Sequence, residues 1–271
     1  MARNTYCIRL VTGLLLLAGL AGGTAAQTAD TLNPIRKKPE KLLRNSPVQQ
    51  FTQGGFNFWQ DEFSGHWAGV DFGFNTLVNT DYTGYDTEFL HHDLRRSNSL
   101  FVNLVQQSIG LQRNRNTIGL VTGVGLQLQS FRLDRNTTIE QTASGRIIPK
   151  TLYFQENQKS KFSMAYLTAP LLLEFQIPIN HYENRLYLSG GMFAGLRISS
   201  HTKIKYRLDK KKEKLKTPDD FSLHKYRYGV MLRTGYRWVN LFCLYDLHPL
   251  FKKEMGPEVT PFTFGFTFVS F

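Results

Sequence analysis

Hydrophobic and polar residues alternate along most of the chain from residue 63 onward, with the period of two that a strand with one apolar face produces. The pattern is sharpest near the C-terminal end, where Phe262, Phe264, Phe266 and Phe268 alternate with small or polar residues. In water such a row of aromatic side chains must be covered by protein, whereas in a bilayer it can face lipid. A strand of this length, tilted at about 45°, is long enough to cross a membrane. The pattern is typical of an outer-membrane barrel.

The alternation predicts eight strands, over residues 63–77, 100–111, 117–131, 162–177, 185–198, 223–238, 241–248 and 260–271. In the first strand, Ala68 and Val70 lie on the predicted apolar face. The second strand changes register, which a bulge near residues 105–107 would explain. The register of Phe271 stays open, because it falls opposite to that of Phe268 and its neighbours unless the strand bulges at its end.

The connections between these strands alternate in length. Residues 78–99, 132–161 and 199–222 form long connections, residues 112–116, 178–184 and 239–240 form short ones, and residues 249–259 form a moderate one. Outer-membrane barrels have short periplasmic turns and longer outer loops, and an even number of strands returns both chain ends to the periplasm. We therefore predict an all-β protein whose residues 63–271 form an eight-stranded antiparallel up-and-down transmembrane β-barrel in the outer membrane. A soluble ligand-binding barrel is the alternative.

The N-terminal residues have the pattern of a secretory signal peptide. Residues 1–26 contain a basic beginning, an apolar stretch over 10–21 and a small-residue cleavage site that ends at Ala26. An uncleaved anchor is the alternative, but the apolar stretch is shorter than the roughly 20 residues that a membrane helix needs. Residues 27–62 are then predicted to form a polar, basic periplasmic extension.

Composition agrees with export and with a barrel. The mean hydropathy of −0.30 excludes a helical membrane bundle, but it fits a barrel, whose strands expose only alternate residues to lipid. Without the signal peptide, Cys243 is the only cysteine, so no intramolecular disulfide is expected. The net charge of +12 could suggest a nucleic-acid partner, but export makes that partner unexpected.

Charged residues lie on the strand faces opposite the apolar rows. We expect this inward set to be Asp71, Glu174, Arg197, Arg227, Arg233 and Asp246. An unpaired buried charge costs several kcal/mol, so the sequence predicts that these acids and arginines pair in one lumen network. Eight strands enclose an interior only wide enough for side chains. The network is therefore predicted to fill and rigidify the barrel, and a narrow path for ions or solutes is the alternative.

Several segments resemble one known family. They read GHWAGVDFG from residue 65, LVTGVGL from 120, YLTAPLLLEFQIP from 166, LYLSGG from 186 and YDLHPLFKK from 245. These segments resemble the PorT-like outer-membrane β-barrel proteins of Bacteroidota, and the resemblance covers the chain from about residue 63. It implies a small barrel, but the segments are strand and turn signatures and carry no chemistry. The best-known namesake is tied to type IX secretion, a role that resemblance of fold alone does not transfer.

The third long connection is strongly basic and contains Lys210, Lys211 and Lys212. A basic loop at the outer leaflet would meet the phosphates of lipopolysaccharide, and clustered cations bind phosphates favourably. We therefore expect a monomeric barrel with a structural or interaction role, whose partners are membrane lipid and lipopolysaccharide. A solvated loop is the plain alternative. A second candidate is an accessory barrel of a secretion machine that binds envelope proteins, and a third is a lipid A-modifying enzyme.

Catalysis would need a nucleophile, a base and an orienting acid near one rim. Ser199 with His201 and Ser222 with His224 are the candidate pairs, but no motif fixes an acid or an oxyanion hole. The adjacent His91 and His92 would point opposite ways on a strand, and no ligand spacing supports a metal site. We therefore expect neither an enzyme nor a bound metal or cofactor.

Overall fold

The computed structural model describes residues 63–112, 116–134, 136–153, 156–179, 184–208 and 211–270. The predicted signal peptide, the predicted extension over 27–62, Lys210 and Phe271 lie outside the described residues. The elements of the described residues are β1 (Gly69–Asp81), the 3-10 turn η1 (Leu94–Arg96), β2 (Asn98–Gly110), β3 (Ile118–Leu133), β4 (Thr137–Gln141), β5 (Ile147–Thr151), β6 (Glu156–Ile179), β7 (Asn184–Leu208), β8 (Lys211–Pro218), β9 (Tyr226–Tyr236), β10 (Val239–Asp246) and β11 (Glu258–Ser270). In this part of the chain, no helix is long and apolar enough to cross a membrane.

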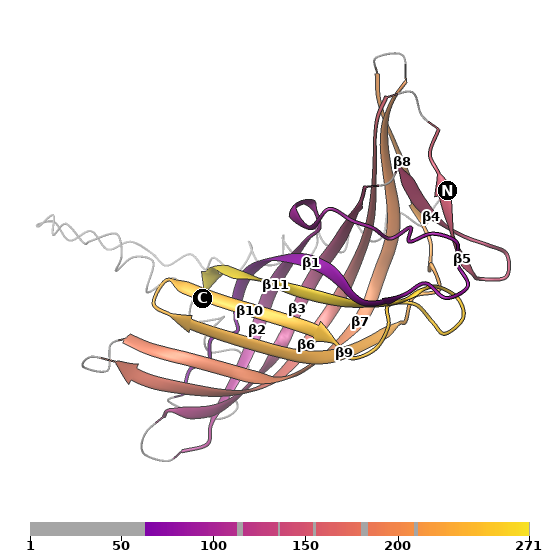
Figure 1. Ribbon diagram of the computed structural model, residues 1–271. Helices are drawn as coiled ribbons and strands as arrows, with labels where there is room; N and C mark the ends of the chain where they lie inside the picture. Colours follow the sequence, from indigo (N-terminus) through magenta and orange to yellow (C-terminus); the bar gives the residue numbers. More distant parts are fainter. Residues whose placement is uncertain are drawn as a thin grey trace, which may run out of the picture. The chain divides into compact units, whose positions relative to one another are not determined.

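Eight of the strands form a closed antiparallel ring in the order β1, β2, β3, β6, β7, β9, β10 and β11 (Figure 1). Pairing of β1 with β11 closes the ring, with Phe72 opposite Phe266 and Phe74 opposite Phe264. The predicted eight-stranded antiparallel barrel is confirmed. Because the ring is closed, none of its strands leaves a full edge of unpaired backbone groups.

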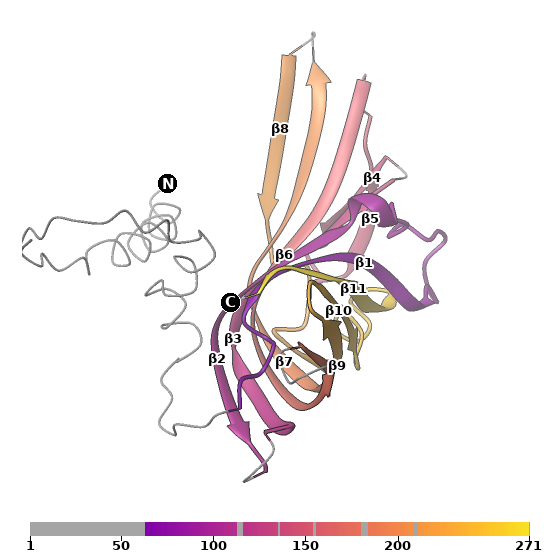
Figure 2. The ribbon, with the colours of Figure 1, turned by 90° about the vertical axis from the view of Figure 1, so that its left-hand side faces the viewer.

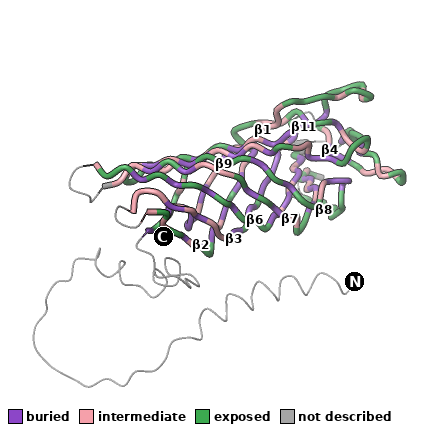
Figure 3. Tube along the Cα trace, turned by 90° about the horizontal axis from the view of Figure 1, so that it is seen from below, coloured by how far each residue is buried: buried purple, intermediate pink, exposed green. Residues whose placement is uncertain are grey.

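Buried residues alternate with more exposed ones along the strands of the ring (Figure 3). Successive side chains of a strand therefore face the lumen and the outside in turn. On β3, Gln127 and Gln129 are buried, whereas Leu126 and Leu128 beside them are 36% and 52% exposed. This arrangement reverses that of a soluble protein, because the polar side chains face inward and the apolar ones face outward. We call the outward-facing apolar residues the apolar band, which includes Leu100, Leu126, Leu128, Leu167, Leu171, Leu188, Leu232, Phe264 and Phe266.

The predicted change of register in the second strand is confirmed. Pairing of β2 with β3 shifts between Asn103 and Val105, so the bulge lies at Leu104, one residue before the predicted range. After the bulge the buried positions are Gln106 and Ser108, and the apolar residues again face outward. The extra residue therefore keeps the apolar face of a mixed pattern on the outside.

The two ends of the ring differ. At one end, here called the short-turn end, lie the short turns and the paired residues Gly69 and Ser270, where β1 begins and β11 ends. The opposite, long-loop end contains strands that the alternation did not predict. A β4–β5 hairpin occupies the connection predicted over 132–161, and β8 pairs with a β7 that continues past Ile198 to Leu208. Figure 2 shows β6, β7 and β8 extending beyond the ring.

An apolar cluster closes the long-loop end. Phe89 and Leu90 from the first long connection pack with Ile139 and Ile147 of the hairpin and with Phe251 from the last connection. The remaining members include Phe131, Leu133, Phe162, Met164, Tyr166, Phe221, Leu223, Leu250 and Val259. We call this cluster the dome. Its side chains are buried together, so the dome fills the space beneath the long connections.

Residues 63–68 run inside the barrel and not along its wall. The predicted first strand begins at residue 63, but β1 begins only at Gly69, and Ala68 is buried at 3% exposure. That part of the prediction is wrong. Gly69 has a φ of +146°, which favours glycine, and a Cβ there would collide with the carbonyl oxygen of Val269. Gly69 therefore lets the chain turn from the lumen into the wall. We call residues 63–68 the plug segment.

Candidate functional site

The plug segment is held by side chains of β2. Gln106 accepts hydrogen bonds at Oε1 from the backbone N–H groups of Trp67 and Ala68, both at 2.7 Å, and its Nε2 donates to the Gly65 carbonyl at 2.8 Å. Asn103 donates to the Trp67 carbonyl at 3.1 Å. These bonds replace the strand pairing that the segment lacks, because a buried backbone polar group needs a partner.

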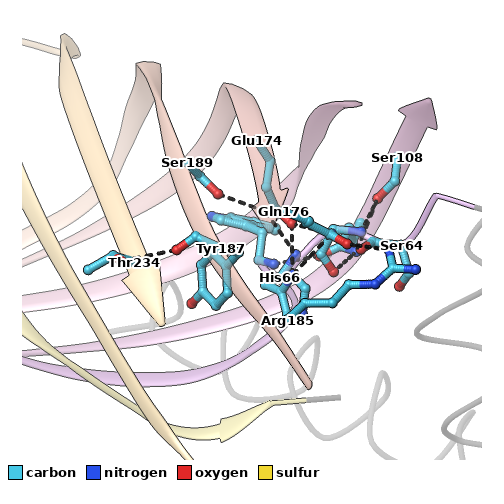
Figure 4. Close-up of polar contacts among 12 residues, drawn as sticks. Ser64, His66, Ser108, Glu174, Gln176, Arg185, Tyr187, Ser189 and Thr234 are labelled. Atoms are coloured by element: carbon cyan, nitrogen blue, oxygen red, sulfur yellow. Dashed lines mark hydrogen bonds and ion pairs between the residues drawn. The ribbon is translucent and has the colours of Figure 1, made fainter. Parts of the chain in front are cut away.

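His66 lies at the centre of a polar cluster at the short-turn end of the lumen (Figure 4). Its ring stacks on Tyr187 at 4.3 Å between ring centres, and its Nδ1 lies 2.7 Å from Glu174 Oε1. The Glu174 carboxylate also accepts from the His66 backbone N–H at 3.1 Å, and from Gln176 and Ser189 at 2.7 Å each. The Glu174 carboxylate therefore has hydrogen-bond donors from the plug segment and from neighbouring strand residues, and none of them is an arginine.

Asp71 and Arg233 form a fully buried ion pair deeper in the lumen. Arg233 donates from Nη1 to Asp71 Oδ2 at 2.7 Å and from Nη2 to Asp71 Oδ1 at 3.2 Å. Asn103 donates to the same carboxylate at 2.8 Å, and Thr267 accepts from Arg233 at 3.1 Å. This two-pronged geometry is the strong form of an arginine–carboxylate contact.

Arg227 occupies a second buried position on the same face of β9. Its guanidinium donates to the side-chain oxygens of Gln127 and Gln129, and it lies 4.3 Å from the ring centre of Tyr166. The Asp246 carboxylate is 3.8 Å away, at the outer limit of an ion pair. Arg227 is thus bound mainly by glutamine oxygens and by an aromatic face.

Arg197 lies at the long-loop end and pairs with Asp220, which also contacts Lys252 at 3.5 Å. Burial acts to raise the pKa of Asp220, but the Arg197 guanidinium outweighs it and holds that pKa below its usual value. The six predicted charges therefore fall into separate groups. The structure joins Asp71 to Arg233 and brings Asp246 near Arg227, but it leaves Glu174 and Arg197 apart from both pairs.

The serine and histidine candidates also have definite places. Ser222 donates to the Gly145 carbonyl at 2.6 Å, and the ring of His224 lies 4.9 Å from that of His248. His91 Nδ1 is 2.6 Å from Asp134, and His92 lies against Phe131 in the dome. Among the described residues, no group of three or more His, Cys, Asp and Glu side chains could hold a metal ion.

Rows of cations cross the sheet where it extends beyond the ring. Arg132 of β3 pairs with Lys161 of β6, which pairs with Lys203 of β7, and Lys203 pairs with Lys216 of β8. In an antiparallel sheet, directly paired residues point to the same face. Alternation extends this face, here called the basic face, to Arg132, Lys159, Lys161, Lys203, Lys205, Arg207, Lys214 and Lys216. The intervening Phe162 and Ile204 are buried, so the basic face is the outward one.

One member of the predicted trio belongs to this face by its strand position. Lys212 pairs with Arg207 of the basic face, whereas Lys211 pairs with Leu208 on the opposite face and Lys210 lies outside the described residues. Sequence reasoning missed the cations of β3 and β6, which lie far from the trio along the chain. The signal was present as alternation of the form Lys-X-Lys at residues 159–161, 203–205 and 214–216.

The cations at the centre of the basic face lie in directly paired positions on neighbouring strands. Within the described residues, none of Arg132, Lys161 and Lys203 forms an ion pair. A cavity of about 600 Å³ opens among them, and Glu213 is the single acid that lines its described part. Like charges directly opposite each other in a sheet are destabilising. An anion with several negative oxygens would relieve this repulsion.

The basic face begins just beyond the apolar band. Moving along β3 and β6, the outward pair Leu128 and Ala165 is followed by Ser130 and Ser163 and then by Arg132 and Lys161. Arg132 lies four positions after Leu128, which is roughly 13 Å along a strand. The change from apolar to cationic side chains over this distance has the dimensions of a membrane–water interface.

A family model described as an outer membrane protein beta-barrel domain matches residues 49–252. The chain belongs to this family. The family accounts for the closed ring and the outward apolar band, and it assigns this barrel to the outer membrane. No curated protein and no solved structure gives a match to the chain.

Proposed function

We propose that this outer-membrane barrel has an interaction role, and that its basic face binds the phosphate groups of lipopolysaccharide in the outer leaflet. One observation carries the proposal: rows of cations lie on the outward face directly beyond the apolar band, and among the described residues Arg132, Lys161 and Lys203 form no ion pair. A basic loop alone would be equally well solvated by water. Cations fixed opposite one another on strands gain more from a bound multivalent anion, because the anion removes their mutual repulsion.

The topology supports an orientation in which the long-loop end faces outward and the chain ends face the periplasm. The basic face then lies at the level of the outer-leaflet head groups, where lipopolysaccharide carries its phosphates. The interior supports a role on the outside of the wall, since Trp67, Phe101 and Phe242 are buried within the lumen and the dome covers the long-loop end. A filled lumen offers no path for a solute.

A charge-neutralising variant tests the proposal. We expect Lys161→Gln with Lys203→Gln to lower the affinity of the purified barrel for lipopolysaccharide at least tenfold at low salt. The matched control is Lys150→Gln with Lys252→Gln, which removes cations that already pair with acids. Unchanged affinity in the first variant, measured by titration of lipopolysaccharide in detergent, would refute the proposal. A loss of affinity of equal size in the control would show that binding depends on net charge and not on the basic face.

A second candidate, an accessory role in a secretion machine, is favoured by the open edge of β8. This strand pairs with β7 on one side, and no described strand pairs with its other side. An exposed edge can accept a strand from another protein. Crosslinking in intact cells separates the two candidates, because only the second demands a stoichiometric protein partner. Recovery of the barrel with lipopolysaccharide alone would exclude the accessory role.

A further inference from the structure

A second cavity lies on the outer wall of the barrel, next to the basic face. Its volume is about 370 Å³, and Leu100, Leu128, Ser163, Lys161 and His201 are among the residues that line it. We call it the wall groove. Apolar side chains lie toward the apolar band, and cations lie toward the basic face. The groove therefore has one apolar end and one cationic end.

The groove exists because one row of the sheet has small or short polar side chains. Asn98 pairs with Ser130, Ser130 with Ser163, and Ser163 with His201, so these residues form a single row across β2, β3, β6 and β7. The row on the apolar side begins with Leu100 opposite Leu128, which are 39% and 52% exposed. The row on the other side carries the cations. The short side chains of Ser130 and Ser163, between the leucines and the cations, leave a trough.

An amphiphile with acyl chains and phosphates matches both ends of the trough. Acyl chains lying along Leu100 and Leu128 would continue the hydrocarbon layer, while a phosphate would reach Lys161 and Lys203. The Ser163 hydroxyl between them offers hydrogen bonds to a sugar. Two successive rows of cations, one through Lys161 and one through Lys159, suit a head group with two phosphates better than one with a single phosphate.

We propose that the wall groove and the basic face together form one discrete seat for a single lipid A molecule. The sugar lies over the serine row, the acyl chains lie against the apolar band and the phosphates lie on the cations. The inference rests on the proposed contact with lipopolysaccharide and deepens it. Diffuse attraction of phosphates to the basic face needs no groove, whereas a discrete seat requires the acyl chains and the small side chains.

Filling the groove without changing its charge tests the seat. Ser163→Trp places an indole in the trough, and Ser199→Trp does the same from β7. The control is Ala169→Trp, an outward position on the same strand as Ser163 that lies outside the groove. Native mass spectrometry of the full barrel in detergent would count bound acylated lipid A, and a titration would give its affinity. Slower migration after heating in SDS would verify that each variant has folded.

We expect one acylated lipid A per wild-type barrel. Either serine variant should lower that affinity about tenfold, whereas Ala169→Trp should leave it unchanged. If both serine variants bind lipid A as tightly as Ala169→Trp does, the proposal of a discrete seat is overturned. The phosphate contact would still stand in that case if the wild-type barrel binds the deacylated bisphosphorylated disaccharide. Failure of the disaccharide to bind the wild-type barrel would instead refute the phosphate contact. Equal affinity for phosphatidylglycerol and lipid A would overturn the assignment to lipid A.

Discussion

Replacing Trp67 with alanine measures how much the plug segment stabilises the barrel. Trp67 is only 1% exposed inside the lumen, and a Cβ on Gly123 or Gly125 would lie 2.6 Å or 3.0 Å from its ring. Removal of a fully buried tryptophan side chain typically costs about 3–5 kcal/mol. The hydrogen bonds of the segment to Gln106 and Asn103 use backbone groups of Trp67, so the substitution leaves them in place. The expected loss is therefore a packing loss.

Denaturant unfolding of the barrel in detergent micelles, followed by gel migration without heating, gives the free energy of unfolding. The control is Trp238→Ala, which removes the same side chain from the turn between β9 and β10, where it is 91% exposed. We expect a loss of about 3–5 kcal/mol for Trp67→Ala and a clearly smaller loss for the control. A loss below about 1 kcal/mol, or losses of equal size, would show that the lumen does not depend on the plug segment.

Three further predictions concern the interior and the dome. Arg233→Met leaves Asp71 buried without its cation, so the free energy of unfolding should fall by about 3–5 kcal/mol; an unchanged denaturation midpoint would contradict the pairing. Gly119→Ala places a Cβ against the Phe63 ring, so it should destabilise the wild type more than a Phe63→Ala background; additive losses would exclude the contact. Burial lowers the pKa of His92 below its usual value of 6.5. As the pH falls, His92 of the unfolded chain therefore takes up a proton before His92 of the folded chain, and the dome should lose stability below about pH 6.5. Hydrogen exchange should show this opening between pH 7 and pH 5, and His92→Gln should reduce it.

The strands of the ring could be predicted because lipid imposes a strict requirement on them. One face of each must be apolar, so alternation is visible wherever a strand crosses the apolar band, as with Leu126 and Leu128 beside Gln127 and Gln129. Beyond the band both faces of a strand can be polar or buried by other segments. The continuations of β6 and β7 and the whole of β8 therefore carry no such signal, and they were predicted to be loops.

The plug segment could not be separated from the first strand, because its own residues continue the alternation. Phe63 and Trp67 keep the period of two, and the one sequence sign of a boundary is that the apolar residues change from odd to even positions at Val70. In the structure, the φ of Gly69 marks the point where the wall begins. The inward direction of the lumen charges could be predicted, but their partners could not. Partners depend on the tilt and stagger of the strands, which bring Glu174 to His66 and Asp71 to Arg233 across large sequence separations.

The filled interior also determines what kind of binding the outer wall can support. Phe162, between the outward Lys161 and Ser163, is buried in the dome, and Ile204 on β7 is buried behind Lys203. Side chains on a braced strand lose less conformational freedom on binding than side chains on a solvated loop. A ligand that bridges several of these cations therefore meets a surface whose spacing is already set. The same bracing holds the cations against their mutual repulsion when no ligand is bound, so part of the folding free energy of the dome opposes that repulsion. Neutralising the basic face should consequently raise the stability of the free barrel while it lowers the affinity for phosphate, an opposition that a loop of solvated lysines would not produce.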